Sequence, residues 1–204
     1  MRGSSRSGGV WAFWLAAVLS AGCSQNPAPQ PPVATNPAAA VPAAPVPPAP
    51  DVPKPADDDG PVYFLDHAQV GLPRAKLMIG TRDLAAEICS SLPQVATGLM
   101  HRRGIGPAEG MLFVFGGPQR RSFYMRNVAF PIAAAYIDTE GVIQEIVQLK
   151  AMDRTPVPSK SDRIQFVLET APDWFERNGV GVGTQIVTDR GSLPEKLGPL
   201  ARLP

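Results

Sequence analysis

The stretch SFYMRNV at residues 122–128 carries the side chains best suited to chemistry. Its first four residues lean apolar, as in a strand, and then Arg126 and Asn127 stand side by side. The guanidinium of Arg126, near Tyr124, could bind a carboxylate or a phosphate through two parallel hydrogen bonds. The asparagine could orient a ligand, or its amide could satisfy backbone groups where strands separate. The stretch therefore builds a binding site or pins a corner of the fold.

Strand geometry would separate these two side chains. Neighbouring residues of a strand point to opposite faces, so we expect Met125 with Asn127 on one face and Tyr124 with Arg126 on the other. This alternation favours a structural role for the asparagine and leaves the arginine as the better candidate for contact with a ligand.

Arg126 itself has two interpretations. It holds an anionic group, with Arg102 or Arg103 nearby, or it is solvated or paired with Asp138 or Glu169. The candidate ligand-binding residues of the sequence are Arg126, Asn127, Tyr124, His101, Arg102 and Asp138.

Cys89 and His101 raise the question of catalysis or metal binding. A histidine can activate a cysteine as a nucleophile, but no nucleophile signature surrounds Cys89, and lone cysteines are commonly buried as small hydrophobes. A metal site would have to join these two residues to Asp138 or Glu109, and no pair has the spacing of metal ligands. We therefore predict no metal and no cofactor, and leave the role of Cys89 open.

The elements that must position these residues are mainly short strands. A serine, a proline in the first turn and a glutamine form a capping box at 91–94, which predicts a short helix ending within TGLMHRR. Asp173 caps a second helix, WFERN, which stops at Gly179. Apolar runs and alternation predict strands at 84–89, 111–115, 122–128, 133–138, 142–149, 163–169 and 180–188.

Apolar and polar residues alternate along the predicted strand at 163–169, which places Glu169 on its solvent-exposed face. Residues 62–188 are thus expected to form a compact, mainly antiparallel β barrel or sandwich with two short helices, and the tail 189–204 is expected to fray.

The first 61 residues have the composition of a targeting and spacer segment. Residues 1–22 combine early arginines with a ten-residue apolar core, VWAFWLAAVL, which is typical of a signal peptide. The sequence LSAGC then resembles the lipobox of bacterial lipoproteins, although Ser20 stands where leucine is commonest, and a plain secretory signal is the alternative. If Cys23 is lipidated, Ser24 favours the outer membrane, facing the periplasm.

Residues 24–61 are rich in proline and alanine, which predicts an extended, solvated tether. A proline-rich ligand for a partner protein is the alternative function for this tether. The net charge of +1 gives no reason to expect nucleic acid as a partner.

Several short strings occur in a familiar order: TGLMHRR, EGMLFVF, SFYMRN, FVLE and GVGVGTQIV. Together they resemble the bacterial and archaeal family numbered 192 among the domains of unknown function, over about residues 75–190. The resemblance implies a small β-rich fold and no established activity. Relatives tend to carry threonine and aspartate where this chain has Val128 and Ala133, and some carry cysteines where it has Met152 and Val157.

These departures weigh against an enzyme that depends on those groups. The sequence therefore favours an envelope lipoprotein, anchored through its N-terminal lipid, whose β domain binds a small ligand or an envelope protein without catalysis. The alternative is an enzyme, a hydrolase for example, with Arg126, Asn127 and His101 lining its pocket.

Overall fold

The structure is a computed structural model, and it describes residues 63–202. The predicted signal peptide, the predicted lipidation site Cys23 and the predicted tether lie outside the described residues. Within this range the structure has ten strands: β1 (Arg74–Ile79), β2 (Arg82–Cys89), β3 (Glu109–Gln119), β4 (Ser122–Phe123), β5 (Ile132–Asp138), β6 (Ile143–Leu149), β7 (Val157–Pro158), β8 (Ile164–Thr170), β9 (Ile186–Thr188) and β10 (Gly191–Ser192). The helices are α1 (Leu92–Thr97), α2 (Trp174–Arg177), α3 (Leu193–Leu197) and the 3₁₀ helix η1 (Gly198–Leu200).

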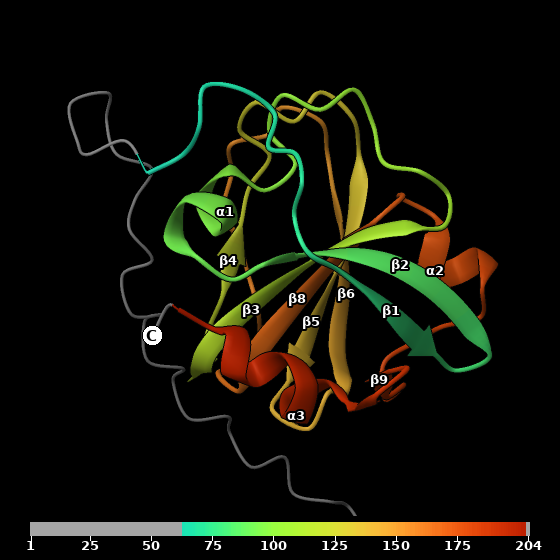
Figure 1. Cartoon of the computed structure of the whole chain (residues 1–204). Coiled ribbons are helices and arrows are strands. Elements are labelled where there is room, and N and C mark those ends of the chain that lie inside the picture. The colour runs from blue at the N-terminus through green and yellow to red at the C-terminus, as the bar shows by residue number, and fades with distance from the viewer. Residues whose placement is uncertain (1–62, 203–204) are drawn as a thin grey trace, which may run out of the picture. The chain divides into compact units, whose positions relative to one another are not determined.

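Eight of the strands form one strongly twisted sheet in the order β10-β9-β1-β2-β3-β8-β5-β6 (Figure 1). Its pairs are antiparallel except β2 and β3, which run parallel and are joined through α1 and a long loop. An isolated bridge between Val142 and Gln185 ties the start of β6 toward β9. The mainly β prediction is confirmed, and the sheet is open and sandwich-like rather than a closed barrel.

Apolar side chains cover both faces of the sheet, because its central strands carry continuous apolar runs. We call one cluster the helix-side core, and its members include Leu77, Ile88, Leu112, Phe166, Trp174 and Leu193. We call the other the loop-side core, and its members include Cys89, Met111, Phe113, Met125, Tyr136 and Val167. The loop-side core also contains an edge-to-face pair between Phe113 and Phe123, with ring centroids 4.9 Å apart.

The two predicted helices are present. At the start of α1, Gln94 Oε1 accepts hydrogen bonds from the backbone N–H groups of Ser90 and Ser91, both at 3.1 Å, as the capping box requires. Asp173 precedes α2 but makes no capping hydrogen bond, and its carboxylate pairs with Arg177 Nε at 2.9 Å. None of the helices within residues 63–202 is both long and apolar enough to cross a bilayer.

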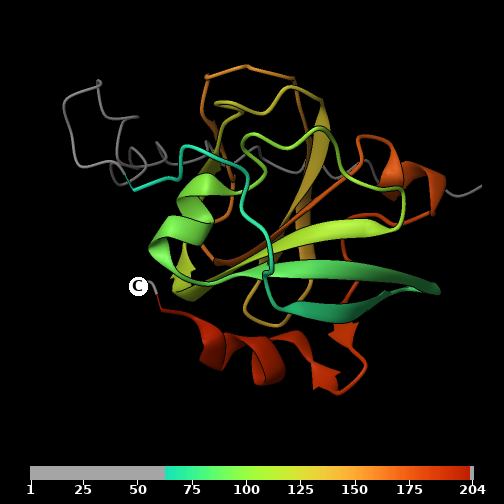
Figure 2. The same cartoon turned by 45° about the horizontal axis from the view of Figure 1, so that its top comes forward.

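The tail predicted to fray is ordered through residue 202. Figure 2 shows α3 lying along the sheet beside β9. Leu193 and Leu197 are buried in the helix-side core, and Arg202 N donates to Ser90 O at 2.9 Å. The prediction was wrong because it weighed the glycines and prolines of this segment and overlooked two leucines four residues apart, which face the same side of a helix.

The predicted strand at 122–128 is also largely wrong. Only Ser122 and Phe123 are strand residues, and the chain then turns through Arg126 and Asn127. The expected split of those two side chains between opposite faces therefore does not apply. The predicted strand at 180–188 is likewise restricted to its last three residues, β9.

Candidate functional site

One end of the sheet gathers most of the loops and most of the predicted site residues. At this end β6 and β8 finish while β3 and β5 begin, and the connecting loops rise above the strands at the top of Figure 1. We call this the loop end. His101, Arg102, Arg126 and Asn127 belong to loops that join strands there.

Three loops meet at the loop end in strained conformations. His101, Asn127 and Met152 are the non-glycine residues with positive φ among residues 63–202, at 63°, 54° and 59°. His101 N donates to Asn127 O at 2.9 Å, and Met152 N donates to Val128 O at 2.9 Å. Left-handed backbone costs free energy at side chains other than glycine, so the surrounding contacts must hold these loops in place.

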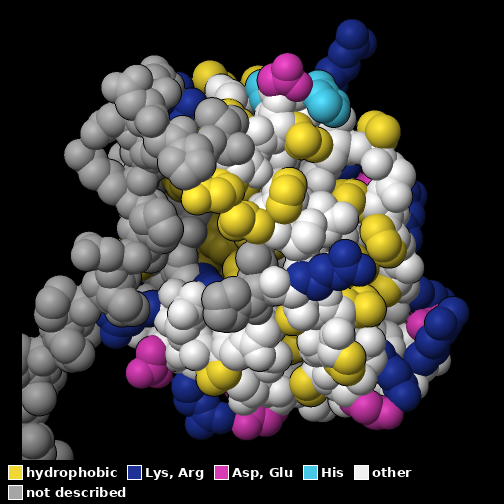
Figure 3. Space-filling view, turned by 60° about the vertical axis from the view of Figure 1, so that its left-hand side comes forward, with side chains coloured by type: hydrophobic (Ala, Val, Ile, Leu, Met, Phe, Trp, Pro, Cys, Tyr) yellow, Lys and Arg dark blue, Asp and Glu magenta, His cyan; other side chains and the backbone are white. Residues whose placement is uncertain are grey.

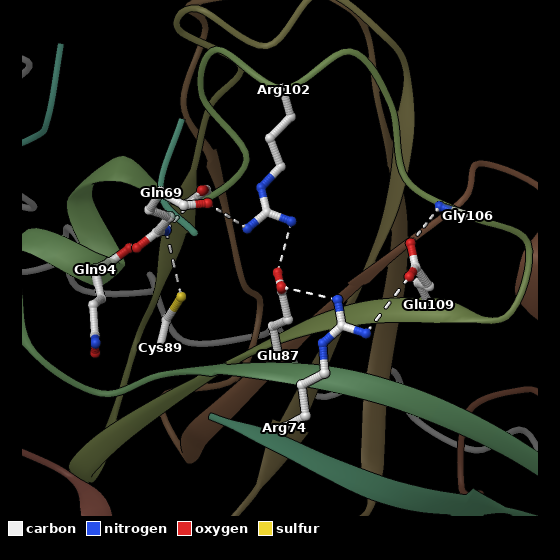
Figure 4. Close-up of polar contacts among 9 residues, drawn as sticks. Gln69, Arg74, Glu87, Cys89, Gln94, Arg102, Gly106 and Glu109 are labelled. Carbon is white, nitrogen blue, oxygen red and sulfur yellow. Dashed lines mark hydrogen bonds and ion pairs between the residues drawn. The ribbon is translucent and has the colours of Figure 1, made fainter. Parts of the chain in front are cut away.

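An ion-pair network lies beneath these loops (Figure 4). Arg102 Nη1 lies 2.6 Å from Glu87 Oε2, and Arg74 Nη2 lies 3.2 Å from Glu87 Oε1. Arg102 Nη2 also donates to Gln69 O at 2.9 Å. Glu87 is only 8% exposed, so two guanidinium groups compensate a carboxylate that would be costly to bury alone.

Gln69 connects this network to α1 and to the thiol. Its Nε2 donates to Gly98 O at 2.8 Å and to Gln94 O at 3.1 Å, and lies 3.7 Å from Cys89 Sγ (Figure 4). Cys89 is fully buried, and this burial raises the pKa of its thiol far above the usual range. The thiol stays protonated at neutral pH, which favours the interpretation of Cys89 as a small hydrophobe.

Glu169 is the residue that sequence reasoning placed wrongly. It is 5% exposed, and burial raises the pKa of its carboxyl to about 8. Glu87, Met111, Glu169 and Ala134 are register partners across four neighbouring strands, so both carboxyls lie on the face of the loop-side core. Burial is the one cause of this raised pKa, and no ion pair or hydrogen bond joins the Glu169 carboxyl to another group among residues 63–202.

The sequence contained a signal for this burial. Val167, two residues before Glu169, lies on the same face of β8. Its side chain is apolar, which is unexpected on a solvent-exposed face. β8 is a central strand of the sheet, and nearly all of its residues are buried, so its second face is covered as well.

The remaining predicted residues do not share one pocket. The Arg126 guanidinium stacks on Phe64, with Cζ 4.4 Å from the ring centre. Tyr124 lines a separate cavity of about 80 Å³ with Lys150 and Asp153.

Asp138 is far from all of these residues. Its Oδ1 accepts hydrogen bonds from the backbone N–H groups of Glu140 and Val142, both at 2.9 Å, so it shapes the β5–β6 turn. That turn is at the opposite end of β5, roughly 20 Å from the loop end at the rise of a strand. A larger cavity of about 510 Å³ lies at the outer edge of β6 and contains none of the predicted residues.

The part of the chain from 63 to 202 contains no group of three or more His, Cys, Asp or Glu side chains placed to hold a metal ion. What the loop end offers chemically is a buried neutral carboxyl, a compensated ion pair and strained loops above them. This arrangement can bind a ligand that brings hydrogen-bond donors.

Comparison with known proteins gives a family and a fold. The family described as DUF192, an uncharacterised ACR, matches residues 75–188, in agreement with the resemblance inferred from the sequence. No curated protein matches the chain.

Two crystal structures are similar to this chain, each with a TM-score of 0.54. A protein from Sinorhizobium meliloti 1021, described as a candidate transcription regulator, is 26% identical, and the match covers 59% of this chain and 98% of that one. A protein of unknown function from Novosphingobium aromaticivorans DSM 12444 is 25% identical, with 59% of this chain and 89% of that one covered.

Proposed function

The chain belongs to the uncharacterised family DUF192, and on that premise we propose that it is a lipid-anchored protein of the cell envelope. Its β domain binds a small ligand or an envelope protein partner at the loop end, without catalysis. The apolar core of residues 1–22, the small residues before Cys23 and the proline-rich residues 24–61 support the anchor and the tether. Several acyl chains on Cys23 would hold the protein stably, since a single chain binds a membrane only weakly.

The buried carboxyl of Glu169, which has no ion-pair or hydrogen-bond partner among residues 63–202, is the observation that carries the binding proposal. A buried polar group without a partner costs free energy, and a ligand that brings a donor recovers it. The three strained loops directly above this end of the sheet are the segments that a ligand would order further. Glu87 lies on the same face but is already compensated by two arginines, so it supports the site without needing the ligand.

The alternative function, a hydrolase, finds weaker support. His101 and Asn127 are joined by a backbone hydrogen bond, which brings two of its three pocket residues together. The thiol of Cys89 is protonated at neutral pH, however, and Asp138 lies at the other end of β5, so neither supplies a base or nucleophile beside them. We therefore favour binding.

A protein partner has a candidate surface beside the loop end. Figure 3 views the side of α1, where several hydrophobic side chains gather and a basic side chain crosses the middle of the face. Tyr63, Val70 and Leu92 on this part of the chain are 51%, 85% and 41% exposed. The net charge of +1 gives no electrostatic reason to extend the regulator description of the Sinorhizobium meliloti protein to this chain.

A ligand screen followed by amide chemical shifts tests the binding proposal. We expect wild-type protein to bind a donor-bearing small molecule with shifts concentrated at residues 99–105 and 125–130. Glu169→Ala should lose this binding by tenfold or more, because the acceptor is removed. Glu176→Ala, an exposed position on α2, is the matched control and should bind as wild type does. Shifts that survive unchanged in Glu169→Ala would overturn the proposal.

Membrane fractionation tests the anchor separately. Replacing Cys23 by serine removes the lipidation site, so we expect the protein to move from the membrane pellet to the soluble fraction. Cys89→Ser is the control and should remain in the pellet. A Cys23→Ser protein that stays in the pellet would show that the lipoprotein assignment is wrong.

A further inference from the structure

Arg121 is a buried cation that has no carboxylate paired with it among residues 63–202. It lies between β3 and β4, remote from the loop end along β3, and is 7% exposed. Burial alone lowers the pKa of its guanidinium to about 10, with no nearby carboxylate to oppose the effect. Arg102 differs from Arg121, because its Nη1 lies 2.6 Å from Glu87 Oε2 and the carboxylate compensates its charge.

The backbone and side chain of Arg121 are held in one position. Arg121 N donates to Ser159 Oγ at 3.1 Å, and Ser159 N donates to Arg121 O at 2.7 Å. The guanidinium stacks on Phe115, with Cζ 3.8 Å from the ring centre, and its Nη2 donates to Gly117 O at 2.8 Å. The guanidinium is therefore oriented before any ligand arrives, which lowers the entropic cost of binding.

Much of the hydrogen-bonding capacity at this position is unused. A guanidinium has five N–H donors, and Gly117 O is the one acceptor that residues 63–202 provide for it. Arg121 Nε and Ser122 Oγ are both buried and have no hydrogen-bond partner there. Nη1 is neither bonded nor fully buried, so this nitrogen is the point at which a ligand can reach the group.

We propose that Arg121 forms a second binding site, which takes a small oxyanion such as a carboxylate or phosphate group. Both groups present paired oxygens to the guanidinium fork, and either would supply the missing negative charge. A desolvated guanidinium attracts such a group more strongly than a solvated one does.

Thermal unfolding of the full chain in sodium phosphate, sodium acetate and sodium chloride at one ionic strength tests the site. We expect phosphate or acetate to raise the Tm saturably, by about 3 °C or more at ten times the dissociation constant. The anion that acts at the lower concentration identifies the carboxylate or the phosphate as the favoured ligand. Equal effects of all three salts would overturn the proposal.

Two variants assign the effect to a residue. Arg121→Gln should abolish the oxyanion-specific rise in Tm, whereas Arg120→Gln, the matched control, should retain it. A rise that persists in Arg121→Gln would place the anion elsewhere and overturn the proposal.

Amide shifts provide a second readout in case Arg121→Gln does not fold. In wild-type protein the same oxyanion should shift the amide signals of Arg121, Ser122 and Ser159. Signals that stay fixed at saturating phosphate and acetate would overturn the proposal without any variant. Because these residues are remote from the loop end, the outcome is independent of the Glu169 experiments.

Discussion

At the scale of single residues, the buried charged side chains have two kinds of environment. Glu87 is compensated by Arg74 and Arg102, as buried charges in stable proteins usually are. Glu169 and Arg121 have no oppositely charged partner within residues 63–202. Burial raises the pKa of Glu169 and lowers that of Arg121, and both shifts favour the neutral form of the side chain. Groups that lower stability in this way are the strongest indicators of function in a chain without recognisable catalytic motifs.

Glu169 should make the stability of the protein depend on pH. Its pKa is about 8 in the folded state and near the ordinary value of 4.5 in the unfolded chain. Between these values the folded state holds a proton that the unfolded state has released, so the free energy of unfolding falls as pH rises. We expect a loss of about 4 kcal/mol between pH 5 and pH 8.5.

Urea unfolding of wild-type protein and Glu169→Gln at these two pH values measures this contribution. Glutamine is neutral at both pH values. The free energy of unfolding of the variant should therefore fall less between pH 5 and pH 8.5, and at pH 8.5 it should exceed that of wild type. Glu176→Gln, which is exposed, serves as the control. Parallel pH profiles for wild type and Glu169→Gln would contradict the prediction.

How well the sequence predicted each residue depended on how local its determinants are. The positions of Arg102 and His101 follow from the end of α1, which local signals specify. The burial of Glu169 depends on which strands flank β8, and those partners come from elsewhere in the chain. Arg121 gave no signal at all, since its environment is created by Phe115, Gly117 and Ser159 together.

At the scale of elements, capping and turn chemistry were more reliable than periodicity. The capping box of α1 could be predicted from the sequence because Ser91 and Gln94 form it within one helical turn. The apolar start of SFYMRNV imitated a strand, yet Met125 and Val128 are buried by a turn in which Asn127 adopts positive φ. Asparagine tolerates this conformation better than most residues, which is a turn signal that alternation concealed.

The docking of α3 leads to a prediction about the C-terminal segment. Leu193 is fully buried in the helix-side core, so Leu193→Ala should lower the free energy of unfolding by about 2–4 kcal/mol. Leu200, in η1, is 43% exposed, and Leu200→Ala should cost less than about 0.5 kcal/mol. Denaturant unfolding of both variants measures the difference. Equal, small effects would show that the segment does not contribute to the core.

At the scale of the whole molecule, one sheet separates two cores, and Cys89 lies fully buried in the loop-side core. In a Cys23→Ser background it is the one thiol of the chain. A thiol reagent at pH 8 should therefore label native protein at least about a thousandfold more slowly than unfolded protein. Fast labelling of native protein would show that the loop end opens locally and exposes the thiol.

The pairing of β1 has a consequence for how the chain is made. β1 has β2, its neighbour in sequence, on one side, and on the other side β9, which lies near the C-terminal end of the domain (Figure 1). The sheet cannot be completed until β9 has been synthesised, and such distant pairings slow folding. For a chain that we propose is delivered to the cell envelope, this late closure would leave the sheet incomplete until nearly the whole domain has been made.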